Sequence, residues 1–283
     1  MVKILAIGDF HGKFPEKLKK KIEKENLDII LCTGDFANAD KIRKIIFKNW
    51  QNKKWHEIIG LKKAAKLEKE SFNSGLEVLK QLNKLGKKIY IIFGNLDFYK
   101  DSETSEPDSI MPGFYEDKIK KLKNIILIDR KKRKINNIDV IGHGKYVDVT
   151  EFIKNPIDKD KKSQKRRLKR YKGSEKKLFK LFSEFKLKKF ILVTHYTPFN
   201  CLDEVKYKQS PMYKKHVGFE PYNKIIKKYK PSLVICGHMH ENQGKCKIKQ
   251  TLVINPGAAQ EGKAAIIDFN EKKGKVKKIE FIK

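Results

Sequence analysis

Cysteine is scarce and irregularly placed in this chain of 283 residues. The four cysteines are Cys32, Cys201, Cys236 and Cys246, and none of them forms the Cys-x-x-Cys spacing of a zinc ribbon or a redox motif. A disulfide-stapled scaffold is therefore not expected, and the reducing cytoplasm is the expected compartment. Because Cys32 and Cys236 stand within apolar runs, we expect both to be buried thiols.

Long apolar runs are also lacking. No stretch approaches the ~18 consecutive apolar residues that a transmembrane helix needs, so no membrane partner is expected. The segment from Met1 to Gly8 lacks the longer apolar run and the cleavage site of a signal peptide, and we expect a first strand there. The apolar content of 39% still supports a folded core, which excludes a wholly disordered chain.

Acidic residues are few beside the basic ones. The chain has 34 Asp and Glu against 66 Lys and Arg, a formal net charge of +32. Such an excess is typical of proteins that bind nucleic acid, an acidic membrane surface or a phosphorylated ligand. The alternative is a compositional bias toward Lys, Glu and Ile, as in heat-adapted organisms, although Lys outnumbers Glu too far for that bias alone.

Short apolar runs alternate with helical patterns along the chain, which predicts an α/β architecture. Continuous apolar runs, such as the one at 89–93, suit strands buried on both faces of a sheet. We expect helices at 15–25, 39–48, 76–85, 174–185 and 221–229. We expect strands at 3–7, 28–32, 88–93, 125–128, 139–141, 189–193, 233–236, 252–254, 264–268 and 276–281. All of residues 1–283 are expected to form a single domain, with a basic helical insertion at about 145–187.

Polar side chains directly follow five of the predicted strands. In open α/β sheets ligands bind beyond the carboxyl ends of the strands, so these side chains should meet. Each motif alone is an ordinary turn. Together they deliver seven metal-capable side chains, namely Asp9, His11, Asp35, Asn95, His195, His238 and His240.

The composition of this set indicates the metal chemistry. Imidazoles with a few carboxylates suit Mn, Fe, Zn or Ni and exclude a dedicated calcium site. Seven ligands are too many for one tetrahedral ion and suit two divalent metal ions. Two divalent ions with two carboxylates would leave a positive site that attracts a phosphate, and paired ions can clamp both oxygens of an in-line displacement.

The motifs Asp-x-His, Gly-Asp, Gly-Asn-x-Asp, His and Gly-His-x-His, in this order over residues 8–240, resemble the calcineurin-like metallophosphoesterase superfamily. The stretch Ile254-Asn255-Pro256-Gly257-Ala258 is also similar to that family. The resemblance implies a four-layer α/β/β/α sandwich with two mixed sheets and a dimetal site at the C-terminal ends of strands. It also implies a metal-dependent phosphoric ester hydrolase in which a metal-bridging hydroxide attacks phosphorus.

The resemblance assigns the ligands to two ions. The first ion would take Asp9, His11 and His240, the second would take Asn95, His195 and His238, and Asp35 would bridge them. The candidate catalytic residues are Asn95, Asp97 and His216. His216 stands between two ligand motifs and either contacts substrate or packs within its loop. His143 faces the site or packs, and Asn38 binds substrate or caps a helix.

One position departs from the family pattern. Many members carry a histidine where this chain has Leu96, and that imidazole helps to protonate the leaving oxygen. Leucine cannot donate a proton, and Asp97 has no imidazole to orient. Members that lack this histidine tend toward phosphodiesters or activated esters, whose leaving groups need less acid assistance. We therefore expect a phosphodiesterase rather than a monoesterase.

Charge is unevenly distributed along the chain. Residues 159–180 hold twelve bases and two acids, whereas residues 97–117 hold seven acids and one base. The basic segment is either a solvated helix face or an arm that contacts the phosphates of RNA or DNA, as in a nuclease. A non-catalytic nucleic-acid-binding scaffold is a further alternative, although a scaffold has little need for a complete ligand set.

Overall fold

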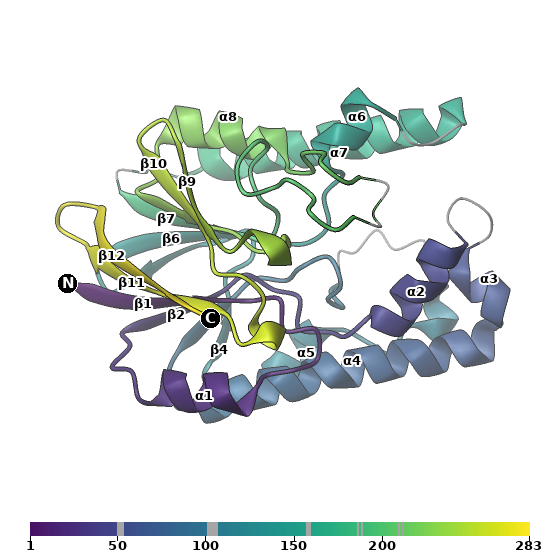
Figure 1. The fold of residues 1–283 in the computed structure, drawn as a ribbon, viewed down its shortest axis with the longest axis horizontal. Coiled ribbons are helices and arrows are strands. Elements are labelled where there is room, and N and C mark those ends of the chain that lie inside the picture. The colour runs from purple at the N-terminus through teal and green to yellow at the C-terminus, as the bar shows by residue number, and fades with distance from the viewer. Residues whose placement is uncertain are drawn as a thin grey trace.

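The structure is a computed structural model that describes residues 1–49, 54–100, 107–156, 160–185, 187, 189–208, 210 and 212–283. Two six-stranded mixed sheets lie at the centre of the molecule, and helices cover the outer face of each sheet (Figure 1). The fold is therefore the four-layer α/β/β/α sandwich that the sequence predicts. Within the described ranges, no helix has both the length and the apolar content that crossing a membrane requires.

The first sheet has the strand order β12-β11-β1-β2-β3-β4. Its four parallel strands are β1 (Val2–Ile7), β2 (Ile29–Cys32), β3 (Ile89–Ile91) and β4 (Ile125–Leu127). On the other side of β1, β11 (Ala264–Asn270) and β12 (Lys275–Ile282) complete the sheet in antiparallel pairing. Both strands overlap the ranges 264–268 and 276–281 that the sequence predicts.

The second sheet has the order β5-β6-β7-β8-β10-β9. Parallel pairing joins β6 (Ile138–His143), β7 (Phe190–Thr194), β8 (Leu233–Ile235) and β10 (Thr251–Asn255). The edge strands β5 (Lys132–Ile135) and β9 (Gly244–Ile248) are antiparallel to their neighbours. The sequence did not predict these two edges, because their lysines hide the alternating pattern.

Helices α1 (Glu16–Glu23), α4 (Leu61–Lys84) and α5 (Tyr115–Ile119) cover the first sheet, and α6 (Thr150–Lys154), α7 (Lys161–Ser183) and α8 (Glu220–Tyr229) cover the second (Figure 1). Two further helices, α2 (Asp40–Lys48) and α3 (Trp55–Ile59), pack near the N-terminal end of α4. Three 3₁₀ turns complete the secondary structure of the described ranges: η1 (Asp108–Ile110), η2 (His240–Asn242) and η3 (Ala259–Glu261).

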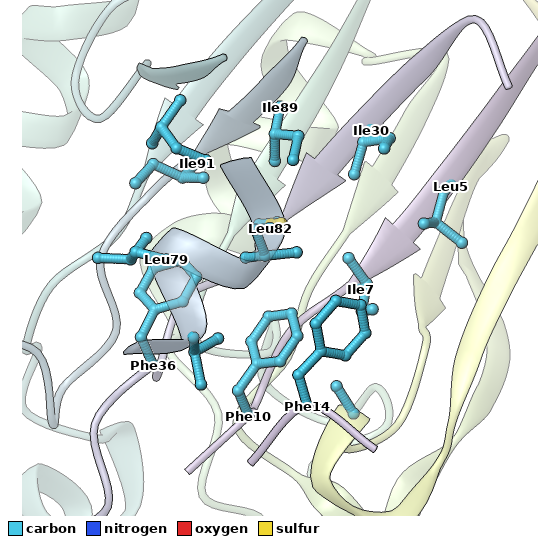
Figure 2. Close-up of a cluster of buried hydrophobic side chains, with 14 of the residues drawn as sticks. Leu5, Ile7, Phe10, Phe14, Ile30, Phe36, Leu79, Leu82, Ile89 and Ile91 are labelled. Atoms are coloured by element: carbon cyan, nitrogen blue, oxygen red, sulfur yellow. The ribbon is translucent and has the colours of Figure 1, made fainter. Parts of the chain in front are cut away.

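The core has three layers, as the sandwich requires. Between the sheets, side chains of both sheets meet, among them Ile4, Leu31, Val193 and Ile254. The outer face of the first sheet packs against α1 and α4 in the cluster of Figure 2, which includes Leu5, Ile30, Leu79, Leu82 and Ile89. A matching cluster joins the second sheet to α7 and α8. Burial on both faces explains why the central strands are continuous apolar runs.

Two helices are longer than the sequence predicted. Helix α4 begins at Leu61 rather than at 76, and α7 begins at Lys161 rather than at 174. In both, lysines dilute the apolar stripe of the first turns. The side chain of Asp160 starts α7 by accepting hydrogen bonds from the backbone N–H groups of Lys162 and Ser163 at 3.2 and 2.8 Å.

Cysteine placement matches the sequence expectation in part. Cys32 and Cys236 are buried free thiols, as expected. Cys201 and Cys246, 45 residues apart, are joined by a disulfide that the sequence did not predict. This bond connects the loop after β7 to the edge strand β9.

Candidate metal centre

The predicted ligands lie at one edge of the sandwich, where β1, β2 and β3 of the first sheet and β7 and β8 of the second come to an end. The loops that leave these strands are drawn together beyond the sheets in Figure 1. Each ligand follows its strand by one to five residues, so the parallel strands bring the ligands to the same edge of the molecule. All but the neutral amide of Asn95 fall into two groups, Asp9, His11 and His240, and Asp35, His195 and His238.

In the first group the ligand atoms of Asp9, His11 and His240 lie within 4.8 Å of one another. The Nε2 atoms of His11 and His240 are 2.8 Å apart, and His240 Nε2 is 3.4 Å from Asp9 Oδ1. Asp9 and His11 are buried, whereas His240 is partly exposed. Three donors therefore converge on one point from two loops.

In the second group the ligand atoms of Asp35, His195 and His238 also lie within 4.8 Å of one another. His195 Nε2 is 3.5 Å from Asp35 Oδ2 and 2.9 Å from Asn95 Oδ1. The same Asp35 oxygen is 4.0 Å from His11 Nε2 of the first group. Asp35 therefore lies between the two groups, where a shared ligand would stand.

The donor set fits two divalent cations. Among the described residues, His11 Nδ1 is buried without a hydrogen-bond partner, and the facing Nε2 atoms of His11 and His240 need a cation or a proton between them. Metal ligation requires neutral imidazoles. Burial lowers the pKa of His11 and, with the neighbouring His195, that of His238 well below its usual value. Burial opposes ionisation of Asp9, but the hydrogen bond and charge of His240 bring its pKa down to about 2.

The backbone of the ligand loops is tightly turned. Asp9, His11, Asp35 and His238 have φ angles of 55°, 44°, 56° and 68°, in the left-handed region that Asp and His enter more readily than most residues. A Cβ atom on Gly94 would lie 2.0 Å from Asp35 Oδ1. A side chain at position 94 would therefore occupy the place of the Asp35 carboxylate.

Asp97 holds the backbone of two ligand loops together. Its carboxylate accepts hydrogen bonds from the N–H groups of Asp35 at 2.9 Å, Phe36 at 2.8 Å, Ala37 at 3.3 Å and Gly94 at 2.8 Å. Burial, followed by the charge of Asp35, raises the pKa of Asp97 to about 7, and the N–H bonds from Gly94 and Phe36 oppose this rise. The carboxyl group thus faces backbone amides, away from the convergence point of the ligands.

Several residues outside the ligand set support the ligands. The carbonyl of Thr33 lies 2.8 Å from His195 Nδ1 and fixes the imidazole orientation, and the Tyr196 ring packs 4.2 Å from that of His238. Asn255 Nδ2 donates to the carbonyl of Met239 at 2.8 Å, between the two ligand histidines of that loop. Sequence reasoning missed the carbonyl of Thr33, whereas Asn255 had a signal, since it stands in the stretch 254–258 that resembles the family.

The sequence left two interpretations open for His143, Asn38 and His216, and the structure shows the contacts of each. His143 is buried, and its Nδ1 lies 2.7 Å from the Tyr222 hydroxyl, so it packs in the core. Asn38 Oδ1 accepts a hydrogen bond from Asp40 N at 2.9 Å, at the start of α2. His216 belongs to neither ligand group, and its Nδ1 lies 2.7 Å from Asp203 Oδ1.

The basic helix α7 is fastened to the body of the protein by two of its own arginines. Asp148 is buried and accepts from Arg167 Nη1 at 2.9 Å and from Arg170 Nε at 3.0 Å. These two arginines belong to the basic segment 159–180, so part of the charge of that segment is paired within the protein. Other bases of α7 are exposed, namely Lys161, Lys162, Lys165, Arg166, Lys169, Lys172, Lys176, Lys177 and Lys180.

Comparison with known proteins agrees with this geometry. Residues 2–242 match the family described as calcineurin-like phosphoesterase, and the chain belongs to that family. An uncharacterised protein of Methanocaldococcus jannaschii is 25% identical over 261 residues, covering 90% of this chain and 88% of the relative.

Solved structures share the fold at low sequence identity. The TT1561 protein of Thermus thermophilus superposes with a TM-score of 0.54 at 14% identity, covering 99% of this chain and 97% of the other. A dimetal phosphatase from Danio rerio has a TM-score of 0.50 at 9% identity, with 94% and 92% covered. At these identities the likeness concerns the fold alone.

Proposed function

We propose that this protein is a dimetal phosphodiesterase that hydrolyses one ester bond of a phosphodiester substrate, in a cytoplasmic setting. The carrying observation is the convergence of two ligand groups with the Asp35 carboxylate between them. Asp9, His11 and His240 would hold one divalent ion, and Asn95, His195 and His238 the other. When bound, the ions would supply Lewis acidity and an activated water.

Groups of the chain itself supply orientation. The backbone carbonyl of Thr33 fixes the ring of His195, and Asp9 accepts the backbone N–H of His238 at 3.1 Å, so the ring of His195 and the backbone of His238 are fixed before an ion arrives. Asn95 turns Oδ1 toward His195, which leaves its amide N–H groups for a phosphoryl oxygen. Asp97 acts by positioning the loops of Asp35 and Gly94 rather than by exchanging a proton.

The preference for diesters is carried by Leu96. Its backbone N–H donates to Asp35 Oδ1 at 2.9 Å, so the residue stands beside the metal ligands, yet its side chain has no proton to donate. A monoester leaving as an alkoxide needs such a donor more than an activated diester does.

The test compares methyl phenyl phosphate, a diester, with the monoester phenyl phosphate in the presence of manganese, because phenolate leaves poorly without protonation. We expect diester turnover and a low monoester rate from the natural chain, and a raised monoester-to-diester ratio from Leu96→His. Leu168→His is the matched control, because Leu168 is an exposed leucine on α7. An unchanged ratio in Leu96→His would remove the argument for diesters, and no turnover with any divalent metal would remove the enzyme.

A nuclease acting on RNA or DNA is the second candidate, favoured by the exposed bases of α7. The discriminating variant changes Lys165, Arg166, Lys169 and Lys172 to Gln and keeps Arg167 and Arg170, which bind Asp148. We expect a nuclease to lose nucleic-acid cleavage and to show a shallower salt dependence, with small-diester turnover unchanged. Four exposed lysines on the opposite helix layer, Lys17, Lys20, Lys21 and Lys24 in and just after α1, changed to Gln, provide the charge-matched control. Nucleic-acid binding without turnover of any ester would indicate the scaffold alternative.

A further inference from the structure

A histidine–aspartate pair lies outside the ligand set. His216 Nδ1 is 2.7 Å from Asp203 Oδ1, and Asp203 is buried while the His216 side chain is 43% exposed. The second oxygen of Asp203 accepts from the backbone N–H groups of Asn200 and Gly218, each at 2.9 Å. A buried carboxylate fixed by three bonds thus sets the orientation of a solvent-facing imidazole.

The pair is built into the loop that joins the two ligand segments of the second sheet. On one side, Phe219 N donates to the carbonyl of Thr197 at 3.0 Å, two residues after the ligand His195. On the other side, His216 pairs with Glu204, whose carbonyl accepts from Asn242 Nδ2 at 2.7 Å. Asn242 belongs to η2, which begins at the ligand His240. His216 therefore stands on a segment that hydrogen bonds connect to both ligand loops.

The chemistry of the pair is that of a proton donor. Because Asp203 accepts the Nδ1 proton, the exchangeable proton of His216 is the one on Nε2. Among the described residues, no hydrogen bond occupies Nε2. When both nitrogens are protonated, Nε2–H is a donor whose positive charge the Asp203 carboxylate stabilises. Leu96 can offer no such proton, so the place of a general acid in this site is open.

We propose that His216, positioned by Asp203, protonates the leaving oxygen of the phosphodiester, and this inference rests on the proposed function. In that step the attacking water oxygen forms a bond to phosphorus and releases a proton to solvent as the bond from phosphorus to the leaving oxygen breaks. The leaving oxygen keeps the electron pair of the broken bond and takes the proton from His216 Nε2. The neutral imidazole then regains a proton from solvent. Asp203 is a positioning residue, because it acts through the imidazole.

The experiment compares two substrates that differ only in their need for a proton, methyl 4-nitrophenyl phosphate and methyl phenyl phosphate. Nitrophenolate leaves readily without protonation, whereas phenolate leaves poorly. We expect His216→Gln to lower kcat/KM for the phenyl ester by about 100-fold or more, the usual contribution of a general acid, and to change that for the nitrophenyl ester little. Metal content and thermal unfolding, measured on the same samples, report whether the loop stays folded.

Two further variants separate chemistry from structure. Asp203→Asn should give a smaller loss with the same bias against the phenyl ester. Added imidazole should restore phenyl ester turnover to His216→Gly while leaving the natural chain unchanged. Equal losses on both esters, or no loss on the phenyl ester, would overturn the role of His216. If the natural chain turns over neither ester with any divalent metal, the proposed function itself fails, and the two failures are thereby distinct.

Discussion

The ligand cluster and the helix α7 are both densely charged, yet they differ in almost every physical respect. In the cluster Asp9, Asp35 and His195 are buried, and each lies within 3.5 Å of a ligand atom from a different loop. On α7 most bases are exposed, and only Arg167 and Arg170, among its described bases, make a buried carboxylate their partner. Burial of charge costs free energy unless each group is paired, so only the cluster required an exact arrangement.

This contrast changes the meaning of the net charge of +32. The groups that carry the proposed chemistry are few, and most are imidazoles. The lysines that dominate the total lie on surfaces where water solvates their charge, and a protein with such residues folds equally well whether or not they bind a partner. The net charge is thus a property of the exposed surface that the fold does not depend on, whereas the cluster depends on the fold for its arrangement. Three substitutions probe this difference.

The largest effect is expected from Asp35→Asn, inside the cluster. Asp35 stands between the two ligand groups, so loss of its charge should weaken both ions. Changes to residues that merely orient metal ligands lower metal affinity or activity by about 10–100-fold, and we expect a shared ligand to exceed this range. Metal content by mass spectrometry and diester turnover provide the measurement. The control is Asp268→Asn, which should retain both, because Asp268 lies on β11 in register with Lys3, at the end of β1 away from the ligands. Full activity in Asp35→Asn would contradict the arrangement.

A smaller effect is expected from Asp97→Asn, one step outside the cluster. The asparagine amide would turn a donor toward backbone N–H groups that now donate to a carboxylate. We expect a loss of about 1–3 kcal/mol in the free energy of unfolding and a decline of about 10–100-fold in metal affinity. Denaturant unfolding and metal titration check this. Asp129→Asn is a fitting control, since Asp129 is a buried carboxylate that accepts from Gly144 N at 2.7 Å; an equal decline in metal affinity there would show that the effect is not specific.

The smallest effect on activity is expected from Asp148→Asn, at the base of α7. Weaker hydrogen bonds to Arg167 and Arg170 should cost about 1.5–3 kcal/mol of unfolding free energy, because those bonds are made by charged groups. Small-diester turnover should stay unchanged. Asp139→Asn, which breaks only the surface pair with Lys132 at 3.6 Å, should cost under about 1 kcal/mol. A large fall in diester turnover in Asp148→Asn would mean that α7 and the ligand cluster are coupled after all.

The sequence predicted those parts of the molecule that depend on local order. The central strands were visible as apolar runs, and the ligands were visible because each follows its own strand within a few residues. The two-sheet layering and the assignment of ligands to ions came from the resemblance. The structure shows the two-sheet layering, and it places Asp9, His11 and His240 apart from Asp35, His195 and His238. The assignment of ligands to ions stays a prediction.

Contacts between distant segments could not be predicted in this way. Asp97 binds backbone amides about 60 residues away, and Asp148 meets arginines about 20 residues away. Neither contact leaves a periodic signal in the sequence. The disulfide between Cys201 and Cys246 likewise joins distant segments. The edge strands β5 and β9 were missed because lysines interrupt their apolar pattern, so only their pairing with the neighbouring strands identifies them.

The pairing of β1 with β11 has a consequence for the order in which the protein matures on the ribosome. The strand made first, Val2–Ile7, is joined along one side to a strand near the end of the chain, in register from Val2 with Phe269 to Ala6 with Ala265. The η3 turn just before β11 also donates from Ala259 N to the carbonyl of Gly8, which precedes the first ligand. Asp9 thus acquires its final surroundings only after synthesis is almost complete. The candidate ligands near the N-terminus of a nascent chain are therefore synthesised long before the surroundings that would let them hold an ion are complete.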